Sequence, residues 1–465
     1  MNKISIRIAA FLFLVMGTAA FGQGGNYFNS GEDQVSKNLS GFVRGGFYGN
    51  FKDSDNKLSI PSSFSDFALK ADIRDGAHFK GFADLRYRYG TEFSEPVNRF
   101  DLREAFVTLN WEKLDISVGQ KIIKWGRTDF TNPTQKLSPQ NLVSRSTDRE
   151  DMDMGNLLTE IKLYPFTALT IQAVAIPYFR SSRLLIGPID LPSYVNIYEI
   201  ESLLTDRKMF TYGLKTDFHL TGVDLSLSWF DGYDPMPGIA LTRFSIDTLK
   251  IIPLPSVDLS TKPYKIRNLG IDFEAALGGF GIRGEVAWKS PYLSYKTYEY
   301  VPMEEINLVG GIDWMKGNWR ITLEYSGKVI PDFEPSAVEP MLTGNIDPAL
   351  LATFLLNPGF NFAEYTRLQT AAFNRLYNYQ LEKWYHSGGL RVEADLLYGK
   401  LTPSVTTTYN FVSKDFMLMP ELVWKPADGL TITAGGDYFS GKKGSLYDIA
   451  DEFMNCFRLG LKVNF

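Results

Sequence analysis

Charged side chains recur at alternate positions along many short segments of this 465-residue chain. Such rows can select ions and polar solutes, or they can pair with one another as a structural network. Catalysis would instead need a nucleophile, a base and an acid within mutual reach. Of the three histidines, the sequence pattern places no serine or carboxylate group beside His78 or His219, and only His386 lies toward the outer side, where an outward-facing enzyme would need its catalytic groups. We therefore expect no enzyme and no catalytic residue.

Metal and cofactor sites have no support in the residue spacing either. The single cysteine, Cys456, excludes a cysteine cluster and an internal disulfide framework. The Asp-Met-Asp fragment at 151–153 is at most a weak Ca²⁺ ligand. We expect no metal site and no cofactor.

The charged residues share one face of their segments, opposite an apolar face. Opposite signs follow each other, as at Arg283 and Glu285, and this favours internal pairing. The basic group formed by Lys70, Arg74, Lys80, Arg86 and Arg88 instead favours anionic solutes. The candidate lining residues of a pore are Arg44, Lys70, Asp72, Arg74, Lys80, Asp84, Arg86, Arg88, Glu104, Lys121, Arg283, Glu285, Arg320, Glu324, Arg391, Glu393, Arg458 and Lys462.

Strands must position these side chains, because only a period of two gives such alternation. The C-terminal segment is a clear case, with Phe457, Leu459 and Leu461 on one face and Arg458 and Lys462 on the other. The pattern predicts eighteen strands, at 41–51, 67–74, 79–89, 100–111, 115–125, 156–164, 169–178, 210–220, 223–230, 266–277, 280–289, 305–314, 319–328, 385–396, 401–412, 416–424, 430–439 and 457–465.

The connections between these strands provide a second test. Every second connection is short, as at 221–222 and 278–279, and the long ones fall between them, as at 126–155 and 329–384, with one short exception at 413–415. A soluble β-sandwich has no reason to separate its loop lengths in this way. The pattern predicts an all-β, transmembrane antiparallel barrel of about eighteen strands, with short periplasmic turns and longer outer loops. Closure then requires the first strand to pair with the last.

The N-terminal residues have the layout of a signal peptide. Lys3 and Arg7 precede the apolar run 8–16, and small residues follow up to residue 22. We expect a signal peptide at 1–22, a periplasmic lead at 23–40 and the barrel at 41–465. The net charge of −5 gives no basic field for nucleic acid, so no nucleic-acid partner is expected.

Two long connections contain candidates for a constriction or a cap. Trp125, Asn132 and Pro133 lie at the start of the first, which can fold into the pore or remain a solvated outer loop. The second is predicted to be helical over about 345–384. Its aromatic residues at helical spacing can cap the barrel mouth, fill the lumen or bind a hydrophobic substrate; they include Phe362, Tyr365, Phe373 and Tyr377.

Two resemblances add to this pattern. The last strand, ending in Phe465, resembles the closing strand of Gram-negative outer-membrane β-barrels. Over about residues 100–185, the chain resembles an uncharacterised, porin-like family of such barrels, known as a domain of unknown function. The likeness is carried by the segments Asp101-Leu-Arg-Glu-Ala-Phe-Val-Thr-Leu, Val118-Gly-Gln-Lys-Ile-Ile-Lys-Trp-Gly126 and Asn132-Pro133. The pattern departs at Gln120-Lys121 and Thr134-Gln135. Alginate-export channels have a related strand.

These resemblances imply a place in the outer membrane of a Gram-negative bacterium. The implied partners are outer-membrane lipid, the barrel-assembly machinery, which would read the strand ending in Phe465, and a small-molecule solute. The implied function is a porin-like channel or transporter for small solutes, hydrophobic or anionic. The alternative is a barrel with a filled lumen that serves as a structural or partner-docking protein.

Overall fold

The computed structural model describes residues 35–52, 57–76, 78–189, 191–199, 203–204, 209–247, 254–340, 357 and 359–465. The predicted signal peptide at 1–22 and residues 23–34 of the predicted lead lie outside the described residues. Residues 345–356, the first part of the predicted helical loop, also lie outside them.

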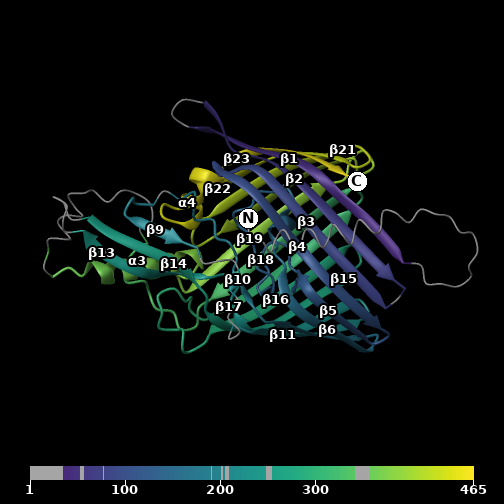
Figure 1. Ribbon diagram of the computed structural model, residues 1–465, viewed down its shortest axis with the longest axis horizontal. Coiled ribbons are helices and arrows are strands. Elements are labelled where there is room, and N and C mark those ends of the chain that lie inside the picture. The colour runs from purple at the N-terminus through teal and green to yellow at the C-terminus, as the bar shows by residue number, and fades with distance from the viewer. Residues whose placement is uncertain are drawn as a thin grey trace, which may run out of the picture. The chain divides into compact units, whose positions relative to one another are not determined.

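Eighteen strands form one antiparallel sheet that closes on itself (Figure 1). This confirms the predicted fold class and the predicted strand number. In order around the sheet, the strands are β1 (Ser36–Lys52), β2 (Lys57–Asp75), β3 (Phe79–Glu92), β4 (Glu95–Trp111), β5 (Leu114–Lys121), β6 (Asn156–Phe166), β7 (Leu169–Ile176), β11 (Thr211–Leu220), β12 (Val223–Tyr233), β15 (Lys265–Leu277), β16 (Phe280–Pro291), β17 (Glu305–Lys316), β18 (Trp319–Val329), β19 (Trp384–Ala394), β20 (Leu401–Asn410), β21 (Phe416–Ala427), β22 (Leu430–Ser440) and β23 (Cys456–Asn464).

The first and last strands close the barrel, as the sequence predicts. Arg44 lies opposite Lys462 in the antiparallel register, and Tyr48 lies opposite Arg458. Beyond the end of β23, the backbone of Phe465 exchanges two hydrogen bonds with that of Gly41, at 2.9 and 3.0 Å. No sheet edge is left open between these two strands.

The outer surface of the barrel is apolar. Val43 and Leu459 are each about half exposed, whereas Arg44 and Arg458, their neighbours in sequence, are less than a tenth exposed. The same alternation of exposed apolar and inward polar positions continues around the sheet. Because so large an apolar surface is stable only against hydrocarbon, the barrel spans a membrane.

The connections differ in length between the two ends of the barrel. At one end the turns after β2, β4, β6, β11, β15, β17, β19 and β21 are short, and Gly222 and Gly278 adopt φ values of +79° and +63° in two of them. At the other end six connections are long, although those after β1, β3 and β20 are short. The predicted asymmetry is therefore confirmed with three short exceptions.

Several predicted strand boundaries need correction, and the largest difference is in β2, which begins ten residues before the predicted start at 67. β1 begins at Ser36, so residues 36–40 belong to the barrel rather than to an N-terminal lead. β5 ends at Lys121, four residues before Trp125. The chain leaves the barrel wall at Ile122, whose N–H donates to the side-chain carboxylate of Glu104 on β4 instead of to a backbone carbonyl.

The long connections contain smaller elements. These are η1 (Arg149–Met152), the paired strands β8 (Phe179–Arg180) and β10 (Leu203–Leu204), the three-stranded sheet of β9 (Val195–Tyr198), β13 (Gly238–Asp247) and β14 (Leu254–Lys262), and the helices α3 (Phe362–Tyr377) and α4 (Leu446–Met454). Among the described residues, no helix has both the length and the apolar character needed to cross a membrane.

α3 confirms a helix within the loop predicted to be helical over about 345–384. The Asn361 side chain accepts a hydrogen bond from the N–H of Glu364 and so caps the helix. α4 is not predicted by the strand pattern, although Ser445 caps it in the same way by accepting from Asp448. Its nine residues are too few for periodicity alone to identify a helix.

Candidate functional site

The long connection between β5 and β6, residues 122–155, lies inside the barrel. Near its start, the Glu285 carboxylate on β16 accepts hydrogen bonds from both the N–H and the hydroxyl of Thr128, each at 2.8 Å. The Glu324 carboxylate on β18 accepts from the three backbone N–H groups of residues 129–131, at 2.9 to 3.2 Å. These inward carboxylates hold the loop against one wall.

The end of the same loop is held by the opposite wall. Arg44 on β1 forms ion pairs with Asp148 at 3.3 Å and with Asp151 at 2.7 Å. Lys462 on β23 contacts Asp148 at 2.8 Å, and Arg86 on β3 contacts Asp151 at 2.5 Å. Because β16 and β18 lie across the closed sheet from β1 and β3, the loop crosses the lumen. We call residues 122–155 the crossing loop.

Asp151 is the strongest of these anchors. Burial alone would raise the pKa of its carboxyl, but the Arg44 and Arg86 guanidiniums and the Ser146 hydroxyl outweigh burial and hold that pKa well below its ordinary value. The group is therefore ionised, and paired, at any pH that the protein meets.

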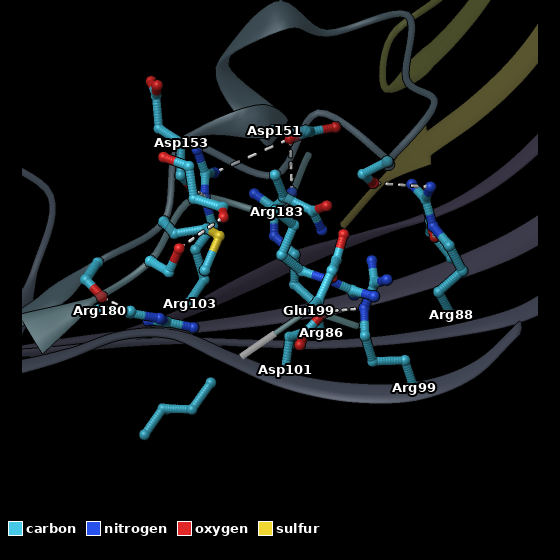
Figure 2. Close-up of a pocket in the computed structure, with 18 of the residues that line it drawn as sticks. Arg86, Arg88, Arg99, Asp101, Arg103, Asp151, Asp153, Arg180, Arg183 and Glu199 are labelled. Carbon is cyan, nitrogen blue, oxygen red and sulfur yellow. Dashed lines mark hydrogen bonds and ion pairs between the residues drawn. The ribbon is translucent and has the colours of Figure 1, made fainter. Parts of the chain in front are cut away.

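A cavity of about 420 Å³ lies between this loop and the wall formed by β1 to β4 (Figure 2). It is rich in guanidinium groups, and five carboxylates lie among them. The arginines are Arg44, Arg86, Arg88, Arg99, Arg103, Arg180 and Arg183, and the carboxylates are Asp66, Asp101, Asp151, Asp153 and Glu199. We call this cavity the arginine pocket. Its lining carries more positive than negative groups.

Most of these guanidiniums have carboxylate partners. Arg88 donates to both oxygens of Asp66, at 2.6 and 2.8 Å. Arg99 contacts Asp101 at 2.5 Å. Such paired groups fix the shape of the pocket but have little charge left for a ligand.

Arg180 differs from the others. Its guanidinium donates to the carbonyl oxygen of Gly155, and it forms no ion pair with a carboxylate of the described residues. Burial lowers its pKa, and only the more distant Asp101 opposes this effect. Figure 2 shows Arg180 apart from the group formed by Arg86, Arg99 and Asp101. It is the guanidinium in this pocket that is most available to an added anion.

Four arginines of the pocket were absent from the residues predicted to line a pore: Arg99, Arg103, Arg180 and Arg183. A bulge explains Arg103, because Asp84 pairs with Glu104 and Leu85 with Leu102, so that the residue between has no partner. Arg103 and Glu104 therefore both face inward, which strict alternation cannot predict. Arg180 and Arg183 follow β7 in a connection where no strand period guides prediction.

Among the eighteen predicted lining residues, Arg44, Asp84 and Glu285 are buried on the inner side of the barrel wall; that the eighteen line a pore stays a prediction. The predicted basic group is nevertheless divided. Arg86 and Arg88 belong to the arginine pocket, whereas Arg74 and Lys80 lie at the short-turn end and share Asp72, at 2.9 and 3.7 Å. Lys70 faces the lumen between these two sets.

Other predicted lining residues form ion pairs within the lumen. Arg391 pairs with Glu393 at 2.5 Å, as their spacing suggests, and Arg320 lies 3.6 Å from the same carboxylate. Arg283 instead pairs with Asp129 of the crossing loop at 2.8 Å. Further pairs join Lys121 to Glu160 and Arg458 to Glu421.

The sequence pattern predicts Trp125 at the end of a strand. In the structure it is instead buried within the crossing loop. It is 1% exposed, and its indole N–H donates to Gln172 on β7. The Asn132 side chain donates to the Trp125 carbonyl at 2.7 Å, and Pro133 is buried beside it. These residues fix the course of the loop through one hydrogen bond within it and one to the barrel wall.

The four aromatic cap candidates lie on α3. Phe362 and Phe373 are buried in an apolar cluster with Ile239 and Val257 of the loop sheet, and Tyr377 packs against it. Tyr365 lines an apolar cavity of about 90 Å³ beside this cluster. The structure thus places these residues in the outer loops, away from the crossing loop.

One histidine has neighbours that the sequence pattern did not reveal. The two ring nitrogens of His219 lie 3.0 Å from the Asp224 carboxylate and 3.3 Å from the Thr170 hydroxyl. The expectation that no carboxylate accompanies this histidine was therefore wrong. The three groups lie at the short-turn end of the barrel and line none of the cavities described here, so they carry no catalytic assignment.

Comparisons with known proteins agree on the architecture. No protein-family model matches the chain. No curated protein matches it either. Solved structures do match. One is the outer-membrane protein OpdK of Pseudomonas aeruginosa, which has 10% identity and a TM-score of 0.53 over 93% of this chain and 99% of that one. Acinetobacter baumannii OccAB3 has 12% identity and a TM-score of 0.51 over 92% and 99%.

A third match is Pseudomonas aeruginosa OccK2 (OpdF), solved in complex with glucuronate, with 12% identity and a TM-score of 0.51 over 92% of this chain and 97% of that one. The likeness is to the OprD/Occ class of outer-membrane channels. At these identities it shows the fold, that of an outer-membrane β-barrel, and not the solute. The predicted likeness to a domain of unknown function gains no support from a family model.

Proposed function

We propose that this protein is a channel of the Gram-negative outer membrane through which small anionic solutes, carboxylates above all, pass. The fold supports a channel, and the loop that crosses the lumen supports selection of the solute by narrowing the path. The long-loop end of the barrel would face outward, because outer-membrane barrels have short periplasmic turns.

The observation that carries the proposal is the arginine pocket. Its volume of about 420 Å³ is in the range of small-molecule sites. Seven guanidiniums and five carboxylates line it, and Asp84 and Glu92 beside it pair with Arg86 and Arg88, so the charge that remains for a ligand is concentrated at Arg180. A guanidinium binds a carboxylate through two parallel hydrogen bonds. Arg180, which lacks a carboxylate partner among the described residues, is the residue we expect to bind the solute.

The glucuronate bound in OccK2 (OpdF) is consistent with this choice of solute class. A hydrophobic solute is less well supported, because the apolar cavity beside α3 has only about 90 Å³ and lies among the outer loops. The anchors of the crossing loop favour the second candidate, a barrel whose filled lumen has a structural role. Conductance decides between the two, since only a channel carries current.

Planar-bilayer recordings of the purified barrel test the proposal. We expect anion-selective reversal potentials in a salt gradient, and a current that glucuronate reduces in proportion to its concentration. Arg180→Gln should shift the reversal potential toward cations and weaken the block by about tenfold, which corresponds to about 1.4 kcal/mol.

Arg320→Gln is the matched control, because it removes the same charge from the lumen far from the pocket. It should leave the glucuronate block unchanged. Absence of current, or cation selectivity in the unmodified protein, would overturn the proposal.

A further inference from the structure

Two tryptophans, on β12 and β16, lie in one row of the outward face near its long-loop end, with a leucine of β15 between them. Trp229 lies opposite Leu269 in the register, Leu269 lies opposite Trp288, and Trp288 lies opposite Ile306 on β17. Trp229 is 39% exposed and faces outward with the apolar belt below it. Tryptophan rings concentrate at the boundary between hydrocarbon and headgroups. This row therefore marks the upper boundary of the membrane.

Charged residues occupy the next outward position above this row. Asp231 lies opposite Arg267, and Arg267 lies opposite Ser290. The Ser290 hydroxyl donates to Glu304 at 2.7 Å, and the Trp288 indole N–H donates to the same carboxylate at 2.9 Å. These groups lie outside the barrel wall, at the height where lipid headgroups begin.

A cavity of about 290 Å³ opens on this charged row. Arg267 and Lys296 line it, and their side chains are 56% and 37% exposed. Leu293 also lines the cavity and is 83% exposed. An apolar side chain this exposed, directly above a lipid-facing belt, is stabilised if an acyl chain or sugar–lipid backbone covers it.

The charges in and around this cavity favour an anion. Arg267 and Lys296 each have one carboxylate partner, Asp231 and Glu304, at 3.2 Å. Lys265 adds a third cation, placed over the Tyr292 ring at 5.7 Å. Arg267 donates to Asp231 through Nε and also hydrogen-bonds to Tyr292, but more than half of its side chain is exposed and can meet a further acceptor. Three cations thus face two carboxylates.

We propose that this cavity, the rim site, binds a phosphate group of the phosphorylated glycolipid in the outer leaflet. Arg267 and Lys296 would donate to the phosphate, while the acyl chains would lie over Leu269 and the belt below. The proposal rests on the outer-membrane orientation given above, and not on anion passage. A phosphate held there would join the barrel to its surrounding lipid.

Native mass spectrometry of the full chain in detergent tests this inference. Diphosphoryl lipid A should bind, and lipid A stripped of its phosphates should bind at least about tenfold more weakly. Arg267→Gln with Lys296→Gln should raise the dissociation constant for diphosphoryl lipid A by about tenfold or more, because both proposed phosphate donors are lost. The charge-conserving Arg267→Lys with Lys296→Arg should retain binding.

Arg243→Gln with Arg367→Gln is the matched control, since both residues are exposed in the outer loops, on β13 and α3, away from the rim site. It should bind lipid A as the unmodified protein does. Equal binding by the rim variant, or equal loss in the control, would overturn the inference. Displacement by millimolar inorganic phosphate would also overturn it, because the site would then be one for free phosphate.

The rim variant should keep the heat-resistant gel mobility of a folded barrel and the conductance of the unmodified protein. Failure of lipid binding with intact conductance would refute the rim site alone. Absence of conductance with intact lipid binding would refute the channel alone.

Discussion

Arg183 and Glu199, which both line the arginine pocket, form a long ion pair of 3.9 Å. Burial raises the pKa of the Glu199 carboxyl, although Arg183 partly opposes this. Glu199 therefore takes up a proton at a higher pH than an ordinary glutamate does. Once Glu199 is neutral, the Arg183 guanidinium no longer has a charged partner in Glu199 and becomes available to a solute.

Anion block should accordingly strengthen as the pH falls from about 7.5 to about 5, toward the raised pKa of Glu199. A sulfonate is the suitable blocker, because its own charge does not change over this interval. Glu199→Gln should show the strong block at every pH and lose the pH dependence. The dissociation constant, measured from the reduction in current at several pH values, checks this prediction.

An unchanged pH dependence in Glu199→Gln would exclude the Arg183–Glu199 pair as its cause. Asp151 is no alternative source, since its pKa lies well below the ordinary value and its charge is constant over this interval.

At the scale of the element, the crossing loop is held by carboxylates that accept hydrogen bonds from its backbone N–H groups. Glu324 accepts from residues 129–131, and Glu285 accepts from Thr128 and from the Thr134 hydroxyl. A neutral amide has one acceptor oxygen and adds an N–H₂ group that would face other donors. Replacement of Glu324 or Glu285 by glutamine should therefore leave backbone N–H groups unpaired.

Glu324→Gln should loosen residues 128–131 at a local cost of about 1–3 kcal/mol. We expect a larger or noisier single-channel conductance, because the loop narrows the lumen only while it is anchored. Glu393→Gln provides the control, since Glu393 lies on the neighbouring strand and pairs with Arg391 rather than with the loop. Identical single-channel records from both variants would argue against the loop as the constriction.

At the scale of the whole molecule, closure of the barrel depends on the C-terminal strand. β23 pairs with β22 on one side and with β1 on the other. Phe465 adds two backbone hydrogen bonds to Gly41, and its ring stacks on Phe67 with centroids 6.2 Å apart. The ring is 57% exposed on the outer surface, so it contributes to assembly and lipid contact rather than to the lumen.

Deletion of Phe465 should lower the fraction of heat-resistant, folded barrel on a gel and leave the reversal potential of the assembled fraction unchanged. Lys462→Gln should leave the folded fraction unchanged and shift the reversal potential, because Lys462 faces the lumen and contacts Asp148 of the crossing loop. A shifted reversal potential in the Phe465 deletion, with normal assembly, would contradict this division of roles.

The barrel can be predicted from the periodicity of the sequence alone. Each strand must place apolar side chains against lipid and polar ones inside. The alternation of apolar and polar residues therefore predicts where a strand lies and which of its faces is outward, and the full set of strands predicts the closed sheet. Arg44, Arg458 and Lys462 could therefore be assigned to the lumen from their positions alone. The same reasoning identified the α3 helix, because Asn361 caps a regular helical pattern.

The site depends on contacts that form only in the folded chain. Arg103 enters the pocket through a bulge that shifts the alternation, and Arg180 belongs to a connection without a period. The crossing loop is fixed by contacts between residues far apart in the chain, such as Thr128 with Glu285 and Asp148 with Lys462. Local periodicity has no information about such distances, since they depend on how the closed wall brings its opposite sides together.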